Sequence, residues 1–537
     1  MSSSICILFI FMVLYILSVH VGPAEATFLP LSTESRWITN GYGKRVKLAC
    51  VNWPSHLEPV LAEGLDKQLA YYISARVRLM GFNCVRFTWP LELPLNETLG
   101  NLTVKQSFQR LGLNESLAGI EVHNPWIVDL PLMTAYEEML AVMERKGLMV
   151  ILDNHVTTPG WCCGLNDGNG FFGDEYFDPK MWIKGLMKMA RMAQKFPNVI
   201  GMSLRNELRG PKSNVDDWYK YMEQGAEAVH SENPNVLVIL SGMSFDKDFS
   251  FLHNRPVNVS FSNKLVFELH WYSFSNGNAW KTGDSNKLCG QITASMMDSA
   301  GFLAKEKGYP IFVSEFGVDM AGKNVGDNKF LSCFMAAAAE QDWDYAVWAL
   351  PGSYYFRQGT KDMDESYGLM NHNWTAVRNI TTLKRINALR LPFRGPGWNR
   401  TVQHKVIFHP LTGLCVEKRP VKGPLRLMPC QMSQMWTYTA NKTLEITGTH
   451  YVLGSSGKAE KMVPLTVSLP HQKATQWDMV SDSKLHLATK AEDGSELCLD
   501  VDRYGLVITN KCKCMDGGDP NCDPASQWFK LVNSTMV

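Results

Sequence analysis

Eight short apolar runs alternate with amphipathic stretches between residues 45 and 390, and this alternation predicts an α/β fold of the (β/α)₈ type, a TIM barrel. The runs are almost continuous in apolar residues, as strands are when both faces of a parallel sheet are buried. After a Pro- and Gly-rich boundary at 391–400 the helical periodicity ends, and tryptophan-bearing segments recur at intervals of roughly forty to fifty residues. The sequence therefore predicts a barrel followed by a C-terminal all-β trefoil domain.

The predicted barrel strands are short and rich in Val, Ile, Phe and Tyr, as buried strands usually are. They span 47–53, 84–89, 149–156, 199–208, 236–242, 265–272, 310–317 and 345–350. The connections after the second strand (91–127) and the third strand (157–178) are unusually long. We expect both of these loops to project from the C-terminal face of the barrel.

The segments between these strands carry a helical repeat. In the stretch after the third strand, Trp182, Leu186 and Met189 recur at three- and four-residue steps. Asp178 followed by Pro179 is typical of an N-cap and the first position of a helix. Helices are predicted on this basis over 178–196, 216–234 and 329–341.

Three Gln-Trp segments organise the C-terminal domain, which we place at 400–537. They are Gln434-Met435-Trp436, Gln476-Trp477 and Gln527-Trp528. A repeat of this length predicts the three units of a β-trefoil, with the tryptophan of each unit packed toward a shared pseudo-threefold core. The barrel domain is then expected to occupy 27–395.

The N-terminus predicts secretion. Residues 5–19 form an apolar run that is short for a membrane span but suits the core of a signal peptide. The "AEA" at 24–26 offers a cleavage site, so a signal peptide at 1–26 and a mature start near Thr27 are expected. An uncleaved signal anchor is the alternative, because residues 1–4 contain no Lys or Arg. The expected location is extracellular or in a cell wall.

Sequons and cysteines agree with an oxidising compartment. The Asn-x-Ser/Thr sequons are Asn96, Asn101, Asn114, Asn258, Asn373, Asn379, Asn399, Asn441 and Asn533. Once Cys6 leaves with the signal, twelve cysteines remain and all can pair. Cys162 and Cys163 are adjacent, and we expect each to bond elsewhere rather than to the other. The Cys512-x-Cys514 spacing lacks the second pair that a zinc site needs.

The charge balance excludes some partners. The formal net charge is +1, which gives no indication of binding to nucleic acid or to an acidic membrane surface. No stretch after the signal is long and apolar enough to span a bilayer. We expect a monomer without a metal or other cofactor.

Polar side chains gather where the predicted strands end, which is where barrels place their catalytic groups. Glu207 and Glu315 follow the fourth and seventh strands, and a pair of carboxyl groups suits glycoside cleavage: one protonates the leaving oxygen and the other attacks the anomeric carbon. Taken singly, the other polar residues also suit structural roles. The candidate site residues are Arg86, His155, Asn206, Glu207, His270, Tyr272, Glu315 and Trp348.

This set, in this order, resembles the retaining glycoside hydrolases of family 5, the cellulase family of clan A. The resemblance covers most of residues 40–390. It implies that Glu207 is the general acid/base and Glu315 the nucleophile. It further implies that Asn206 bonds the sugar 2-hydroxyl, that Arg86 and Tyr272 hold Glu315, that His270 lies near Glu207, and that His155 lines the −1 subsite. An aromatic such as Trp348 can stack on a pyranose ring.

The two-domain arrangement and the loop sequence "GWCCGLNDGNGFFGDEYFDP" resemble secreted plant members of the family, including cellulase-like pollen proteins. The C-terminal domain resembles the ricin-B lectins less closely. Gln434-Met435-Trp436 has their Gln-x-Trp form, whereas the other two segments lack the middle residue. Whether this domain binds a glycan stays open.

Three functions remain on the sequence alone. The first is a retaining β-glycosidase acting on an oligo- or polysaccharide such as plant-type β-glucan or mannan, or on a β-glucoside. The second is a transglycosylase that uses the same site. The third is a non-catalytic, lectin-like carbohydrate-binding protein.

Overall fold

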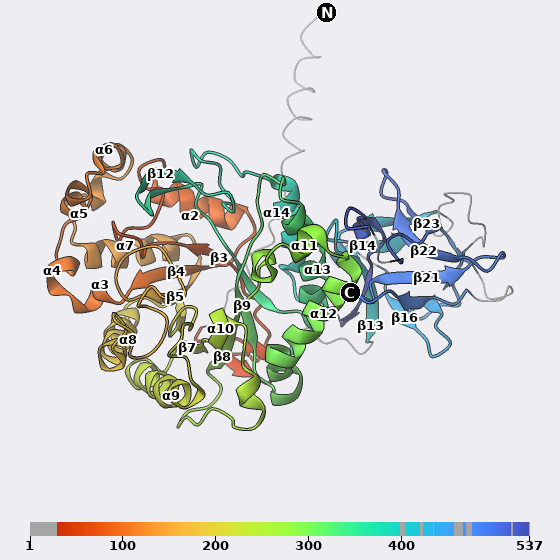
Figure 1. Cartoon of the computed structure of the whole chain (residues 1–537), viewed down its shortest axis with the longest axis horizontal. Coiled ribbons are helices and arrows are strands. Elements are labelled where there is room, and N and C mark those ends of the chain that lie inside the picture. The colour runs from red at the N-terminus through yellow and green to blue at the C-terminus, as the bar shows by residue number, and fades with distance from the viewer. Residues whose placement is uncertain are drawn as a thin grey trace, which may run out of the picture.

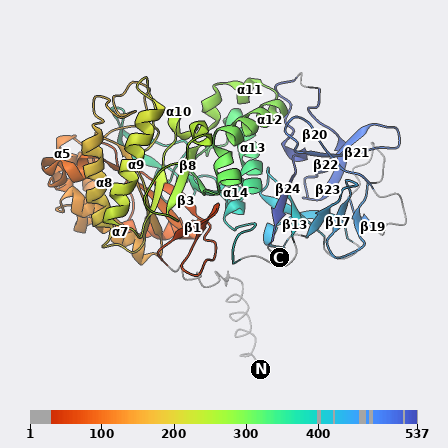
Figure 2. The ribbon, with the colours of Figure 1, turned by 90° about the horizontal axis from the view of Figure 1, so that it is seen from below.

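The computed structural model describes residues 29–397, 403–418, 423–432, 434–455, 465–468, 475–516 and 519–535. The predicted signal peptide and the sequon Asn399 lie outside these ranges. Figures 1 and 2 show two parts side by side, a barrel domain and a β-rich C-terminal domain, with helices α12 to α14 between them. No helix in the described ranges is long and apolar enough to cross a membrane.

Eight parallel strands close into a barrel, which confirms the predicted fold. The last strand pairs with the first, so the sheet has no free edge. The strands are β3 (Ala49–Trp53), β4 (Cys84–Pro90), β5 (Met149–Val156), β6 (Val199–Ser203), β7 (Leu237–Leu240), β8 (Leu265–His270), β9 (Ile311–Phe316) and β10 (Asp344–Val347).

The outer helices follow the predicted order. The three segments with a helical repeat form α8 (Pro179–Ala193), α9 (Val215–Glu232) and α13 (Val325–Gln341). The others include α2 (Ala70–Leu79), α7 (Leu132–Arg145), α12 (Ser285–Met296) and α14 (Ile380–Ile386). The loop after the second strand holds α3 (Glu92–Leu95), α4 (Glu97–Gly100), α5 (Val104–Arg110) and α6 (Asn114–His123).

Helix α8 begins as the sequence predicts. The Asp178 side chain accepts a hydrogen bond from the Met181 N–H, and Pro179 occupies the first turn. The helix buries Trp182 against α9, where Gly225 lies so close that an added Cβ would be 2.4 Å from the indole. Only glycine fits at that crossing, which brings the two helices together on the outside of β6.

The N-terminal end of the barrel is sealed. The hairpin of β1 (Ser32–Glu34) and β2 (Trp37–Thr39) brings Leu31 and Ile38 against the inward side chains of the strands. Cys50 and Cys84, which are paired across β3 and β4, form a disulfide within the same cluster. This end is packed, so a functional site belongs at the opposite end.

The C-terminal domain consists of antiparallel strands, as predicted for an all-β trefoil-like domain. One sheet contains β13 (His404–His409), β14 (Leu414–Lys418), β15 (Leu425–Met428), β16 (Trp436–Tyr438), β17 (Leu444–Ile446), β18 (Val452–Leu453), β19 (Val467–Ser468) and β24 (Lys530–Ser534). The other contains β20 (Asp478–Val480), β21 (His486–Lys490), β22 (Glu496–Val501) and β23 (Val507–Lys511).

The three repeated tryptophans are all fully buried, but they do not share one core. Trp436 and Trp477 lie in the core of the C-terminal domain. Trp528 instead joins the hydrophobic cluster of the barrel, and its Nε1 donates to Asn286 Oδ1 of α12 at 2.9 Å. The expectation of a common core therefore fails for the third unit, because its tryptophan fixes the domain to the barrel.

All twelve cysteines in the described ranges are paired. The bonds are Cys50–Cys84, Cys162–Cys163, Cys289–Cys333, Cys415–Cys430, Cys498–Cys512 and Cys514–Cys522. The expectation that Cys162 and Cys163 bond elsewhere is wrong. Every other cysteine in the described ranges has a partner of its own, so these two are left to join each other within the loop after β5.

Candidate active site

Glu315, at the end of β9, is held by donors on both carboxylate oxygens. Arg86 Nη1 on β4 donates to Oε1 at 2.8 Å, and the Tyr272 hydroxyl, just after β8, donates to Oε2 at 3.0 Å. The three residues come from different strands, and the closure of the barrel brings their ends together. A carboxylate fixed at both oxygens has one defined orientation, as a nucleophile needs.

Arg86 is surrounded by carboxylates. Its Nη2 lies 3.0 Å from Asp153 and 3.3 Å from Glu268, in addition to the contact with Glu315. Burial alone would lower the pKa of Arg86, but these negative charges raise it above its ordinary value. Arg86 therefore stays charged inside the barrel.

Glu207 follows β6 in an uncommon backbone conformation. Its φ is +49°, in the left-handed region that L-residues seldom adopt. Its N–H donates to Asp246 Oδ2 at 2.8 Å, and its Oε1 lies 2.9 Å from His270 Nδ1. These contacts fix where the carboxyl group points. Burial raises the pKa of Glu207, which favours its protonated form.

The two glutamates meet across one cavity. One oxygen of Glu207, one oxygen of Glu315 and one nitrogen of His270 all lie within 4.8 Å of one another. Burial also raises the pKa of Glu315, to about 7, although His270 and Arg86 lower it. His270 and Arg86 thus reduce the effect of burial without cancelling it. Because Glu315 has two donors on its carboxylate and Glu207 has one histidine, a single shared proton is more stable on Glu207.

The remaining predicted residues line the same cavity or support it. His155 lies 2.6 Å from Asp153 through Nδ1 and stacks on Trp348, with ring centroids 5.5 Å apart. Burial lowers the pKa of His155 well below its usual range, so the ring is neutral. Asn206 Oδ1 accepts from Arg86 Nη2 at 2.9 Å, which fixes the direction of its amide group.

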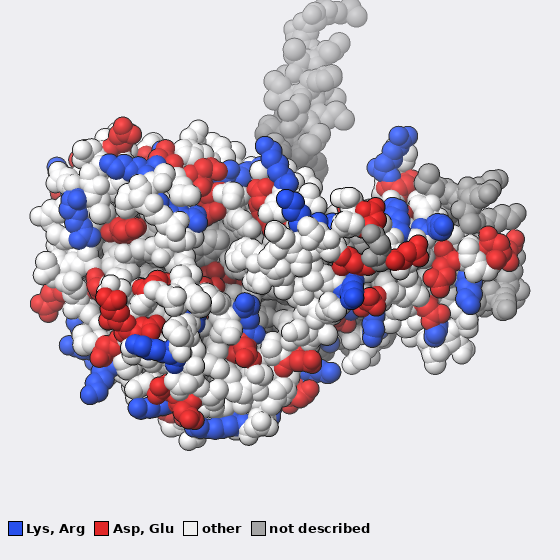
Figure 3. Space-filling view, in the orientation of Figure 1, with Lys and Arg blue, Asp and Glu red and all other residues white. Residues whose placement is uncertain are grey.

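The cavity has a volume of about 440 Å³ and opens at the C-terminal end of the barrel. Seven of the eight predicted site residues line it, and the eighth, Arg86, lies beneath them against Glu315. Its aromatic lining includes Trp348 and Trp161, whose rings meet edge to face at 6.1 Å. Figure 3 shows acidic and basic residues interspersed on the face of the molecule that it presents.

Several site residues were not predicted. Asp246 and Phe245 belong to α10 (Met243–Asp246), a turn without periodicity, so no sequence pattern indicates them. Glu268 lies inside β8, where it accepts from the Ser203 and Ser241 hydroxyls. A carboxylate within a predicted buried strand was the signal that could have identified Glu268.

Two clusters could in principle hold a cation, but their atoms are already engaged. In the first cluster, His270 contacts Glu207 through Nδ1 and Ser314 through Nε2. Both oxygens of Glu315 accept hydrogen bonds. The second cluster combines Glu207 with Cys162 and Cys163, whose sulfurs form a disulfide and are therefore not thiolate ligands.

Comparison with known proteins agrees with this geometry. The family model described as Cellulase (glycosyl hydrolase family 5) matches residues 67–353. A "Glycosyl hydrolase 5 family protein" of Chamaecyparis obtusa is 41% identical over 527 residues, which is 95% of this chain and 94% of the relative. An endoglucanase of Paenibacillus polymyxa is 23% identical over 367 residues, covering 64% of this chain and 83% of the relative.

Solved structures share the barrel fold. A hyperthermostable endocellulase superposes with a TM-score of 0.55 at 19% identity, covering 67% of this chain and 99% of that one. The catalytic domain of the major endoglucanase of Xanthomonas campestris gives a TM-score of 0.53 at 18% identity, with the same coverage. At such identities the likeness concerns the fold alone.

Proposed function

Because the chain belongs to glycosyl hydrolase family 5, we propose that it is a retaining β-glycosidase that cleaves β-linked glucan. The observation that carries the proposal is the meeting of Glu207 and Glu315 across one cavity, with oxygens within 4.8 Å of each other. Retaining enzymes need carboxyl groups about 5–5.5 Å apart, whereas inverting enzymes leave room for a water at about 6.5–9.5 Å.

In the first half of the reaction Glu315 attacks the anomeric carbon while Glu207 donates its proton to the glycosidic oxygen. The leaving sugar departs with that proton, and a covalent glycosyl-enzyme ester forms on Glu315. In the second half Glu207, now ionised, removes a proton from water, and the resulting hydroxide displaces Glu315. The anomeric configuration is inverted twice and so retained.

The surrounding residues serve these steps. Asn206 is oriented by Arg86 so that its amide can bond the 2-hydroxyl of the reacting sugar. Trp348, supported by His155, offers an aromatic face for a pyranose ring. The choice of glucan is supported by the endoglucanase and cellulase names of the relatives.

The stereochemistry of the first product tests this function. Incubation with a soluble β-glucan oligosaccharide, followed by proton NMR of the new reducing end, is expected to show the β-anomer before mutarotation. Release of the α-anomer first would contradict the retaining mechanism. Glu315→Gln is expected to abolish turnover of an aryl β-glycoside without changing the melting curve.

We also infer that the protein is secreted. Six disulfides favour an oxidising compartment. Of the eight sequon asparagines in the described ranges, Asn379 is partly exposed and the other seven are exposed. N-terminal sequencing of protein from a eukaryotic secretion host is expected to begin near Thr27, and an intact N-terminus would contradict this inference.

A further inference from the structure

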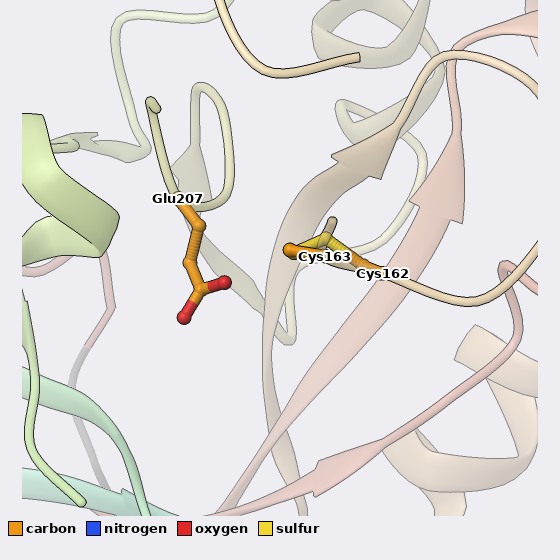
Figure 4. Close-up of side chains that lie close together, drawn as sticks. All are labelled: Cys162, Cys163 and Glu207. Carbon is orange, nitrogen blue, oxygen red and sulfur yellow. A yellow bond between two sulfur atoms is a disulfide. The ribbon is translucent and has the colours of Figure 1, made fainter. Parts of the chain in front are cut away.

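A disulfide between two neighbouring residues forms part of the cavity wall. Cys162 and Cys163 are bonded to each other and line the cavity together with Trp161. Figure 4 shows this disulfide and the Glu207 side chain next to each other. The mechanism proposed above uses Glu207 and leaves the sulfurs without a role.

The structure fixes the disulfide relative to Glu207 through one arginine. Arg209 Nη1 donates to the Glu207 carbonyl at 2.7 Å, and Arg209 Nε donates to the carbonyl of Gly164 at 2.8 Å. Gly164 directly follows Cys163. The same guanidinium forms a salt bridge with Asp167 of this loop at 2.5 Å. The loop with the disulfide and the strand end with Glu207 are therefore one fixed unit.

The amide of Asn206 also faces the sulfurs. Its Nδ2 lies 3.6 Å from Cys162 Sγ and 3.4 Å from Cys163 Sγ. Its Oδ1 is committed to Arg86, so the amide nitrogen cannot turn away. The disulfide thus lies where the strand end presents both Asn206 and Glu207 to a substrate.

Glu207 lies between two clusters of side chains. His270 and Glu315 form one with it, and Cys162 and Cys163 form the other; within each cluster the atoms lie within 4.8 Å. Glu315, which attacks the anomeric carbon, belongs to the first cluster only. Since Glu207 would protonate the oxygen between the attacked carbon and the leaving sugar, a leaving sugar bound on the side of Glu207 away from Glu315 would contact the second cluster.

The chemistry of this wall is apolar. A disulfide has no hydrogen to donate and its sulfurs accept hydrogen bonds only weakly, so it suits the C–H face of a sugar ring rather than its hydroxyls. Phe245 also lines the cavity, and it precedes Asp246, which bonds the Glu207 N–H. Two separate loops thus bring apolar groups beside the proton donor.

We propose that the Cys162–Cys163 disulfide is the surface on which the leaving-group sugar packs. This contact would determine how efficiently the enzyme cleaves substrates whose leaving group is a sugar rather than a small group. In the second half of the reaction, the same surface contacts the sugar or water that attacks the glycosyl-enzyme. This inference rests on the proposed function and adds to it a specificity-determining contact.

The test compares two substrates that share the glycosyl group transferred to the enzyme and differ in the leaving group. The leaving group of cellotetraose is a sugar. The leaving group of β-cellobiosyl fluoride is only fluoride, which fills no sugar site and needs no protonation. In Cys162→Ala/Cys163→Ala, kcat/KM for cellotetraose is expected to fall by about tenfold, a usual loss for a few apolar contacts in a pocket. The change is expected mainly in KM, and kcat/KM for the fluoride should stay within about twofold of wild type.

The matched control is Cys514→Ala/Cys522→Ala, which removes a disulfide of the C-terminal domain far from the cavity lining. Both rates should stay at the wild-type level in that variant. Equal rates of the cavity variant and the wild type on both substrates would overturn the inference. An equal loss on both substrates would also overturn it, because the disulfide would then act through Asn206 or Glu207.

Failure of the proposed function is distinguishable, since the wild type would then cleave neither substrate. Calorimetric binding of cellotetraose to the wild type and to the cavity variant then decides the inference, and an unchanged Kd overturns it. If the variant lacks the wild-type melting curve, both rates are measured on the native enzyme before and after treatment with a water-soluble phosphine. Alkylation and mass spectrometry verify that the Cys162–Cys163 disulfide has been reduced. The reduced enzyme is expected to lose kcat/KM for cellotetraose as the double variant does, and to keep kcat/KM for the fluoride.

Discussion

The Arg86 guanidinium and the Glu315 carboxylate form an ion pair at the centre of the barrel, with 2.8 Å between Nη1 and Oε1 and no exposure of the arginine side chain. Asp153 and Glu268 lie within 3.3 Å of the same guanidinium. One cation therefore offsets the charge of three carboxyl groups, and it orients the carboxylate proposed as the nucleophile.

Arg86→Met is expected to lower stability and remove activity together. Loss of one partner from a buried ion pair leaves uncompensated charge and costs about 3–5 kcal/mol of unfolding free energy. Thermal melting checks the first effect and turnover of an aryl β-glycoside the second. Arg191→Met, which breaks an exposed ion pair with Glu232, is the control and should melt like the wild type. An Arg86→Met protein with wild-type melting would contradict the role assigned to the cation.

Glu207→Gln is expected to leave the acidic limb of kcat/KM for β-cellobiosyl fluoride in place. Burial raises the pKa of Glu315, so activity is lost as the pH falls through that pKa and the nucleophile becomes protonated. The shared proton is on Glu207 when Glu315 ionises, so the variant replaces a neutral carboxyl group with a neutral amide and removes no charge. The fluoride needs no proton donor, so the variant remains measurable. A limb that moves to clearly lower pH would show that Glu207 is charged while Glu315 titrates and would place the shared proton on Glu315.

Asp246→Ala is expected to weaken proton donation selectively. The variant removes the acceptor of the Glu207 N–H, which holds a backbone with φ of +49°. A lost buried hydrogen bond costs about 1–3 kcal/mol, or roughly tenfold or more in rate if it acts on the transition state. kcat/KM should therefore fall for cellotetraose and change little for β-cellobiosyl fluoride. An equal fall for both would show that Asp246 supports the fold rather than the acid.

Gly225→Ala is expected to destabilise the barrel without touching the site. The new methyl group would lie 2.4 Å from Trp182, so α8 and α9 would have to separate, at a cost of about 1–3 kcal/mol. A lower melting temperature with unchanged KM is the expected result. Trp182→Phe makes room for the methyl group but loses the hydrogen bond from the indole to the Leu204 carbonyl, so the loss in the double variant is expected to be smaller than the sum of the two single losses. Losses in melting temperature that simply add in the double variant would show that the strain does not arise at the contact between residues 225 and 182.

The barrel and most of its site were predictable because both follow from strand periodicity. Each strand is buried along its length, so a polar residue such as Glu207 or Glu315 at its end had to lie at the barrel mouth. The position of Arg86 in a predicted strand fits a structural ion pair and a residue that supports catalysis equally well. Only the closed barrel shows that it joins Glu315 to Asp153.

The rest depends on contacts between segments that have no periodic pattern. Asp246 lies in a turn whose left-handed backbone no sequence rule indicates. The pairing of Cys162 with Cys163 follows only when the partners of all the other cysteines are known. Trp528 repeats the pattern of Trp477 but packs on the barrel, because the position of the domain on α12, and not the repeat, decides its neighbours.

Trapping the proposed covalent ester between Glu315 and the sugar is the sharpest test of the mechanism. A 2-deoxy-2-fluoro-β-cellobioside with a good leaving group forms the ester quickly and releases it slowly. After proteolysis, mass spectrometry is expected to find the fluorosugar on the peptide that contains Glu315, and none in the Glu315→Gln variant. A label on Glu207 or on another residue would contradict the account.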